Sequence, residues 1–484
     1  MNEIVALDAL SLSRRIRARE VSCREVMRAY LDRIARLNPL LNAIVSLEPE
    51  ESLLAQADAC DAMLSRGQWL GWMHGMPQAP KDLAQTRGMR TTWGSPIFRD
   101  FVPDQDAAIV ERVRSAGAIL VGKTNVPEFG LGSQTFNEVF GPTRNPWDPS
   151  RTAGGSSGGA AAALAARMLP VADGSDMMGS LRNPAAFCNV YGFRPSRGRV
   201  PNTLAPDAFS QQLSTDGPMG RSVADVAMLL ATQAGYDARA PLSLDNDPAV
   251  YAQPLERDFA GARIGWLGDL GGHLPFEPGV LELCRDALKA FETIGCTVDE
   301  ARVDFDPARM WQTWLTWRRF LVSGSLAVHY RDPQRRALLK PEAVWEIEQG
   351  LGTAAIDVHD ASVARTALYR AVLAAFERFD FLVLPTAQVF PFDVNQRWPR
   401  QIAGREMDTY HRWMEVVILP TLTGCPALSV PAGFGASGDS AGLPMGIQIV
   451  GRPRDDLSVL QLGHAWERAT EWGRREPAGL REVA

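Results

Sequence analysis

Two serines and a lysine are the residues of this chain whose types and spacing best suit acyl-transfer chemistry. Ser156 lies in the loop Gly154-Gly155-Ser156-Ser157-Gly158-Gly159, Ser180 lies 24 residues after it, and Lys81 lies 75 residues before it. Acyl transfer needs an attacking oxygen and hydrogen-bond donors aimed at the oxyanion that forms. Small-residue loops provide both, because they hold hydroxyls beside bare backbone N–H groups. These three residues are therefore candidates for one catalytic unit.

Each candidate also has an ordinary structural explanation. Serine is a preferred N-cap residue, so Ser180 alone would be interpreted as the cap of a helix that begins near Leu181. Ser156 alone would belong to a flexible Gly-Ser loop, and Lys81 alone would be a surface lysine. Only the joint presence of all three favours catalysis.

The surroundings of Lys81 favour a buried amine. Its apolar neighbours are Pro77, Ala79, Pro80 and Leu83. A lysine can act as a base only if burial or a neighbouring charge depresses its pKa from about 10.4. Asp82 would raise that pKa if its carboxylate pointed inward. We therefore expect Asp82 to point away from the amine or to bond backbone.

Further runs of small, polar and proline residues accompany the serine loops along nearly the whole chain. They are Asn42-Ala43-Ile44-Val45, His74-Gly75-Met76-Pro77, Val121-Gly122-Lys123-Thr124-Asn125-Val126-Pro127-Glu128-Phe129, Thr143-Arg144-Asn145-Pro146-Trp147, Asn183-Pro184-Ala185-Ala186, Gly192-Phe193-Arg194-Pro195, Gly424-Cys425-Pro426-Ala427-Leu428-Ser429-Val430-Pro431 and Gly442-Leu443-Pro444-Met445-Gly446-Ile447-Gln448. With Lys81, Ser156 and Ser180, this joint pattern resembles the amidase signature family, hydrolases that use a Ser–cis-Ser–Lys triad.

The resemblance implies a role for each candidate. Ser180 would be the nucleophile, Ser156 the bridging serine after a cis Gly155–Ser156 bond, and Lys81 the final proton acceptor. The backbone N–H groups of Met177, Met178, Gly179 and Ser180 would form the oxyanion hole. Positions that would support the triad or line the pocket are Ser157, Gly132, Ser133 and Trp413.

The chain departs from the family pattern beside the nucleophile. The family usually has Asp-x-Gly-Gly-Ser, whereas this chain has Asp176-Met177-Met178-Gly179-Ser180. Met178 keeps the N–H donor but places a long, pliable side chain at the acyl site. If the position required positive φ, methionine there would be strained. We expect the departure to affect rate and acyl-group size more than reaction class.

Two other motif matches point to different chemistry. Residues 117–124 fit the phosphate-binding pattern GxxxxGK[ST], but their middle is strand-like and Pro127 interrupts the helix that should follow. Residues 154–158 fit GxSxG, the nucleophile elbow, but a proline-broken polar loop precedes them instead of a buried strand. A nucleotide site and a Ser-His-Asp hydrolase are therefore weaker alternatives.

Composition excludes several functional classes. The 484 residues are 46% hydrophobic and 22% charged with a net charge of −6, which argues against a nucleic-acid partner. No apolar run reaches the roughly 18 residues of a membrane span, and the N-terminus lacks signal-peptide features. Six scattered cysteines predict free thiols in a reducing, cytoplasmic compartment. No histidine or cysteine spacing indicates a metal, and we expect no cofactor.

Periodicity predicts how these residues are positioned. Helical patterns cover residues 8–37, 107–116, 160–168 and 222–233, with Asp8 and Ser11 as candidate caps of the first. Short apolar runs predict strands over 118–121, 168–172, 263–267, 381–384, 427–430 and 447–450. This alternation predicts an α/β fold with a mixed, mostly parallel sheet covered by helices on both faces.

No clear linker divides the chain. We therefore expect a single unit over residues 1–484, as the resemblance also implies, with an N-terminal helical region packed on it. The triad would lie in a catalytic core over approximately residues 70–205. A substrate-pocket and helical insertion region would cover approximately residues 240–420.

The predicted activity is hydrolysis of the C–N bond of an amide, or of a related carbamate or hydrazide, through a serine acyl-enzyme. Aromatic residues at 311, 314, 317 and 320 and around Trp413 favour an apolar or aromatic small-molecule substrate, although such stripes more often belong to a core. One alternative is the glutaminase subunit of a tRNA-dependent amidotransferase, which would need partner chains. Another is a catalytically impaired binding protein on the same fold. The sequence leaves open whether the chain forms a homodimer.

Overall fold

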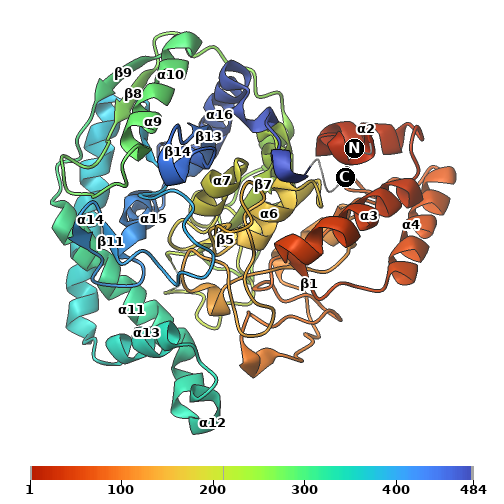
Figure 1. Cartoon of the computed structure of the whole chain (residues 1–484), viewed down its shortest axis with the longest axis horizontal. Helices are drawn as coiled ribbons and strands as arrows, with labels where there is room; N and C mark the ends of the chain where they lie inside the picture. The colour runs from red at the N-terminus through yellow and green to blue at the C-terminus, as the bar shows by residue number, and fades with distance from the viewer. Residues whose placement is uncertain (1–2, 211, 481–484) are drawn as a thin grey trace.

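A central eight-stranded mixed sheet organises the computed structural model, which describes residues 3–210 and 212–480 (Figure 1). Its strand order is β5-β7-β6-β13-β14-β10-β8-β9. The strands are β5 (Val171–Asp176), β6 (Tyr191–Arg194), β7 (Thr215–Gly220), β8 (Arg263–Trp266), β9 (Thr297–Glu300), β10 (Phe381–Pro385), β13 (Ala427–Phe434) and β14 (Pro444–Val450). The α/β class and the mixed sheet are confirmed.

The direction of the strands differs from the prediction in one respect. Five neighbouring pairs are antiparallel and two, β10–β8 and β8–β9, are parallel. The expectation of a mostly parallel sheet is therefore wrong. One reason is that the sequence pattern did not reveal β6 and β7. These strands and β5 form antiparallel pairs. Another reason is that apolar runs do not fix strand direction, since the predicted strand β14 pairs antiparallel with both β10 and β13.

Helices cover both faces of this sheet, as predicted. The helices are α6 (Gly158–Ala165), α7 (Arg182–Cys188), α8 (Val223–Gln233), α9 (Val280–Ala287), α10 (Lys289–Ile294) and α16 (Asp456–Thr470). On one face α7 packs closely against Gly446 of β14. Any side chain larger than that of glycine would be crowded there, because an added Cβ would lie only 3.0 Å from the Ala186 side chain. On the other face α16 crosses β13, where a Cβ at Gly463 would lie 2.2 Å from Leu428.

An N-terminal group of helices packs beside the sheet, on the side of α6 (Figure 1). It comprises α1 (Glu3–Ala6), α2 (Ala9–Arg17), α3 (Cys23–Leu41) and α4 (Glu50–Ser65). The single helix predicted over residues 8–37 is therefore two helices. Ser22 and Glu25 form a capping box that starts a new helix. The predicted cap Asp8 is confirmed, because its side chain accepts from the Ser11 backbone N–H.

The remaining elements frame the loops between these layers. Two short strand pairs flank Lys81. They are β1 (Ile44–Val45) with β4 (Lys123–Thr124), and β2 (Pro77–Gln78) with β3 (Ile119–Leu120). The other elements are α5 (Ala108–Ser115), α11 (Pro307–Arg331), α12 (Pro333–Arg336), α13 (Pro341–Leu351), α14 (Ala355–Arg378), β11 (Gln401–Ile402), β12 (Arg405–Glu406) and α15 (Ile418–Thr423). Among residues 3–210 and 212–480, no helix is long and apolar enough to cross a bilayer.

Candidate active site

The loop that carries Ser156 is held between β5 and the start of α6. The Gly155–Ser156 peptide bond is cis, as the resemblance implied. The Ser157 backbone N–H donates to the Ser180 carbonyl at 3.2 Å, so the two serine loops are tied together. Gly174 of β5 permits this approach, because a Cβ there would lie 2.5 Å from Ser157 Oγ. The short contact explains why a strand residue beside the loop is glycine.

Lys81 is the centre of a buried hydroxyl cluster. Only 1% of this residue is exposed. Its Nζ lies 2.8 Å from Ser156 Oγ, 2.9 Å from Ser157 Oγ and 3.0 Å from Ser175 Oγ. The predicted contact between Lys81 and Ser156 is thus present, and Ser175 is an additional partner that sequence reasoning missed.

Burial controls the charge of this amine. Desolvation lowers the pKa of Lys81 to about 7, although the carboxylates of Asp216, Asp173 and Asp176 act in the opposite direction. Asp82 does not contribute, because its carboxylate accepts from the Thr92 backbone N–H at 3.0 Å and from the Thr92 hydroxyl. The expectation that Asp82 bonds backbone away from the amine is confirmed. A substantial neutral fraction of Lys81 therefore exists near pH 7.

Ser180 lies in the same cavity as Ser156 but is not hydrogen-bonded to it. It is 6% exposed and occupies the turn between β5 and α7. Across the described ranges 3–210 and 212–480, no hydrogen bond of its side chain occurs. The structure therefore joins Lys81 to Ser156 directly and brings Ser180 only to the same cavity wall. Catalytic hydrogen bonds are often long in a free enzyme and tighten with substrate.

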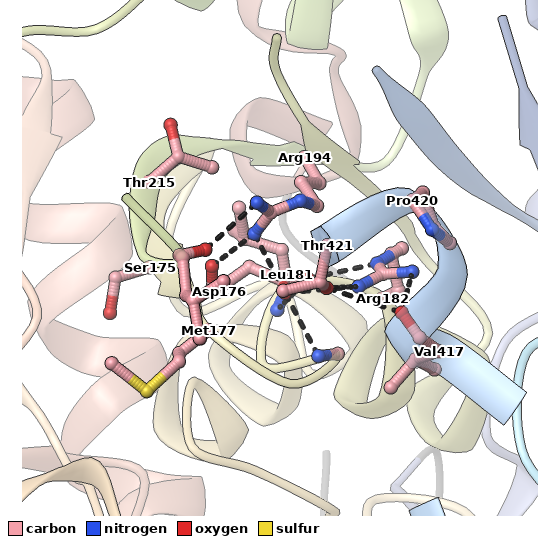
Figure 2. A network of polar contacts seen from close by, with 12 residues as sticks. Ser175, Asp176, Met177, Leu181, Arg182, Arg194, Thr215, Val417, Pro420 and Thr421 are labelled. Carbon is pink, nitrogen blue, oxygen red and sulfur yellow. Dashed lines mark hydrogen bonds and ion pairs between the residues drawn. The ribbon is translucent and has the colours of Figure 1, made fainter. Parts of the chain in front are cut away.

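A buried ionic network anchors the turn before Ser180 (Figure 2). The Asp176 carboxylate accepts from Arg182 Nε at 2.9 Å and from Arg194 Nη1 at 3.2 Å. Burial alone would raise the pKa of Asp176, but these two guanidinium groups hold it well below its usual range. Arg182 also reaches α15, donating to Val417 O and Thr421 Oγ1 at 3.1 Å each. The network fixes the turn to two different parts of the chain.

This network changes the predicted oxyanion hole. The Gly179 backbone N–H donates to Asp176 Oδ1 at 2.9 Å, so this predicted donor is already engaged, which corrects that assignment. In the described part of the chain, the backbone N–H groups of Met177, Met178 and Ser180 donate no hydrogen bond. Gly179 has φ +78°, whereas Met178 is not among the residues of positive φ. The strain considered for Met178 is therefore absent, and three free donors remain.

The cavity in front of Ser180 is mainly apolar. Its volume is about 290 Å³. Its apolar walls are formed by Leu83, Trp93, Phe129, Leu131, Met177, Met178, Leu321, Val322, Leu326 and Met414. Such a lining with a few polar groups is typical of small-molecule sites. The aromatic stripe of residues 311, 314, 317 and 320 lies in the core, the more usual place for such stripes, and the following turns of α11 line the cavity.

Arg318 is the charged residue of this lining and was not predicted. It pairs with Glu346 of α13, and its Nη2 donates to Tyr410 Oη at 2.7 Å. Its Nη1 faces Met177 Sδ at 3.6 Å, a weak acceptor. One strong donor is therefore held at the wall of the cavity while Glu346 balances its charge. No short sequence signal could show it, because the partners lie 28 and 92 residues away.

The predicted supporting residues fall into two groups. Gly132 lines the cavity, Ser157 contacts Lys81, and Ser133 Oγ is within hydrogen-bond distance of the Gly155 carbonyl. Trp413 is fully buried in the core against Phe187 and Phe392, outside the cavity lining.

The competing motifs do not have the required context. After residues 117–122 the chain forms β4 instead of a helix, and Lys123 is buried against Ala84 O and Thr86 Oγ1 at 2.6 Å each. No strand directly precedes the GxSxG match in the described chain. The phosphate-loop and elbow interpretations are therefore wrong.

Comparison with known proteins extends over almost the whole chain. A family model described as Amidase matches residues 25–460. A glutamyl-tRNA(Gln) amidotransferase subunit of Thermosynechococcus vestitus is 34% identical, covering 96% of this chain and 98% of its own. The subunit of the same name from Acidothermus cellulolyticus is 36% identical, covering 97% and 95%.

Solved structures similar to this chain include stand-alone enzymes. A bacterial aryl acylamidase of the amidase signature family has TM-score 0.88 at 29% identity, covering 99% of this chain and 98% of its own. A 6-aminohexanoate cyclic dimer hydrolase has TM-score 0.86 at 25% identity, covering 98% and 99%. The glutamyl-tRNA(Gln) amidotransferase subunit of Thermotoga maritima has TM-score 0.76 at 27% identity, covering 97% and 96%.

Proposed function

This chain belongs to the amidase signature family, and within that family we propose that it is a stand-alone amidase for an apolar or aromatic substrate. The substrate would be an amide or a related carbamate- or hydrazide-type compound. The observation that carries the proposal is the apolar cavity beside Ser180 and the Lys81–Ser156 pair. Within the chain of 1–484, the predicted core (about 70–205) and pocket region (about 240–420) would both contribute to it.

The proposed reaction begins at Ser180. Its Oγ attacks the substrate carbonyl carbon while its proton passes to Ser156 Oγ, and the Ser156 proton passes to neutral Lys81 Nζ. The free N–H groups of Met177 and Met178 donate to the oxyanion. Protonation through the same path releases the amine and leaves an acyl-enzyme. Water then attacks the ester, releases the acid and returns the proton to Ser180.

The chemistry of the cavity favours a neutral substrate over free glutamine. Glutamine carries an ammonium and a carboxylate, and each would need a counter-charge when buried. Arg318, the charged lining residue, already pairs with Glu346, and no Asp or Glu lines the described cavity. Arg318 Nη1 suits an uncharged acceptor, such as an ether or carbonyl oxygen, on an otherwise apolar molecule. We further propose that the enzyme is cytoplasmic and works without a cofactor, a metal, a membrane or a nucleic-acid partner.

The amidotransferase alternative has its own support, since the curated relatives at 34% and 36% identity are glutamyl-tRNA(Gln) amidotransferase subunits. A panel of aryl amides, alkyl amides and glutamine would separate the two. We expect aryl amides to be hydrolysed by the isolated chain and glutamine to be inert. Ammonia release from glutamine only with tRNA and partner chains would reject the stand-alone role. Inertness toward every amide would favour the impaired binding protein.

The pH dependence of kcat/KM should report Lys81. The amine accepts a proton only when neutral, and its pKa is about 7. Activity should therefore be low at pH 5.5, rise about tenfold per pH unit below the pKa and level off above about pH 8. Asp216→Asn should move the midpoint to lower pH, because the Asp216 carboxylate raises the lysine pKa. Burial raises the pKa of Asp216 itself to about 7, so its charge is only partly present in this range and the shift should be modest. A flat profile from pH 5.5 to 9 would contradict the role of Lys81.

Shortening Met178 should change acyl-group selectivity. Met178 is 3% exposed and lines the cavity beside the nucleophile. We expect Met178→Gly to improve kcat/KM for bulky acyl groups relative to small ones by about 1–3 kcal/mol, the scale of a methylene-sized change in an apolar pocket. Met178→Ala is the matched control for added backbone freedom. An unchanged size profile in both variants would show that Met178 does not limit the acyl site.

A further inference from the structure

A second cavity, which shares no lining residue with the one beside Ser180, lies at the C-terminal end of α15. Its volume is about 520 Å³. The lining includes Arg197, Arg365 and Arg454 and the hydroxyls of Thr366 and Tyr369, and none of its described residues is Asp or Glu. A concave site with three cationic side chains and no acid differs in chemistry from the apolar cavity.

Arg365 is the residue that makes this cavity unusual. It is only 8% exposed, yet among the described residues it forms no ion pair with a carboxylate. Its Nε donates to Leu422 O at 2.5 Å, while its Nη atoms reach Gln212 only at 3.4 and 3.5 Å. A buried charge is costly unless it is paired. The two Nη groups therefore lack a strong acceptor.

Several other buried arginines of this protein pair with carboxylates. Arg182 pairs with Asp176, Arg199 with Asp456 and Arg318 with Glu346. In the cavity, by contrast, neither Arg197 nor Arg454 has a carboxylate partner within the described chain. Buried Arg33 also has no ion pair with a carboxylate in the described chain, but this cavity brings together three arginines that lack one.

The arginines also repel one another. Burial first, and then the charges of Arg197 and Arg194, lower the pKa of Arg365 to about 9. Burial lowers the pKa of Arg197 as well, and Arg454 acts in the same direction. An anion between these groups would remove the repulsion and supply the missing acceptor.

We propose that this cavity binds a small phosphate-type anion through Arg197, Arg365 and Arg454. The planar guanidinium fork matches phosphate oxygens bidentately, and a dianion offsets more of a triple positive charge than a carboxylate does. The Tyr369 hydroxyl provides a further donor, whereas the Thr366 hydroxyl already donates to Ser362 O at 2.9 Å. Leu242 and Leu244 leave an apolar side on which an organic substituent of the phosphate could rest.

Calorimetric titration of the full chain with inorganic phosphate, at constant ionic strength and pH 7.5, tests the proposal. We expect saturable binding at one site. Arg197→Gln and Arg454→Gln should each weaken it about tenfold, the scale of one charge-assisted hydrogen bond. Both residues are exposed, so these variants should fold. Arg285→Gln, which removes an exposed arginine paired with Glu300, is the matched control and should bind as the unmodified chain does.

Parallel titrations with phenyl phosphate and benzoate identify the source of the anion. Tighter binding of phenyl phosphate would support a phosphorylated small molecule, and equal binding of both phosphates would support free phosphate. Tighter binding of benzoate would overturn the phosphate class. Absence of saturable binding by either phosphate, or equal loss in the Arg285→Gln control, would overturn the site itself. Amidase activity plays no part in these readouts, so they are independent of the proposed function.

Discussion

Ser180→Ala is expected to lower kcat by about 10⁶-fold, the scale seen when a hydrolase triad loses its nucleophile. The physical reason is that no other hydroxyl has the same position. Ser156 and Ser175 also line the cavity, but both lie against Lys81 Nζ, at 2.8 and 3.0 Å. Ser180 lies in the same turn as the free N–H groups of Met177 and Met178 and makes no hydrogen bond to Lys81 in the described structure. Removing its Oγ should therefore abolish both turnover and acyl-enzyme.

Two measurements check this result. Steady-state hydrolysis of an aryl amide gives kcat, and mass spectrometry after a serine-directed fluorophosphonate probe detects the covalent adduct. Ser175→Ala is a control for loss of one cavity hydroxyl and should keep the adduct. Thermal unfolding of Ser180→Ala should match that of the unmodified chain, since Ser180 has no side-chain hydrogen bond to lose in the described structure. If Ser180→Ala formed as much of the fluorophosphonate adduct as the unmodified chain, Ser180 would not be the nucleophile.

The contact of Lys81 with Ser156 and the place of Ser180 on the same cavity wall could be predicted from sequence, because these residues lie in short loops of distinctive composition that resemble a known family. Gly-Ser runs mark both serine loops, and proline and alanine around Lys81 indicate burial. The pairing of Asp82 with backbone was also predictable, since its charge would otherwise oppose a neutral lysine. The burial of Lys81 and the bonding of Asp82 depend on neighbours in the chain, whereas the grouping of the three candidates depends on the joint pattern of motifs along it.

The parts that could not be predicted depend on contacts between distant segments. Strand β7 contains Gly217 and Pro218, residues that are depleted in strands, and it forms because it pairs with β5 and β6. The engaged N–H of Gly179 follows from Asp176, whose position is set by arginines from two other elements. Arg318 enters the cavity from α11, far along the chain. Tertiary packing decided each case, and local propensity carried no sign of it.

Lys81→Met is expected to be nearly as damaging as loss of the nucleophile, lowering kcat by about 10⁴–10⁶-fold. Methionine preserves much of the buried alkyl volume but removes the proton acceptor of Ser156. The three hydroxyls around Nζ would keep their positions in the loops, yet no group could take the proton that leaves Ser180. Lys123→Met is a useful comparison, because Lys123 is another buried lysine whose Nζ contacts Ala84 O and Thr86 Oγ1 instead of the serines. It tests the cost of deleting a buried amine as such.

The proton path itself is tested by combining changes. If Ser180, Ser156 and Lys81 act as one unit, Lys81→Ala with Ser156→Ala should cost little more in kcat than the worse single change. The distance of 2.8 Å between Nζ and Ser156 Oγ makes such coupling physically direct. Kinetics of the two single variants and the double variant on one aryl amide measure it. If the double variant lost kcat by the product of the two single losses, each residue would retain its effect without the other. The two residues would then act independently, and a shared path from Ser180 through Ser156 to Lys81 would be rejected.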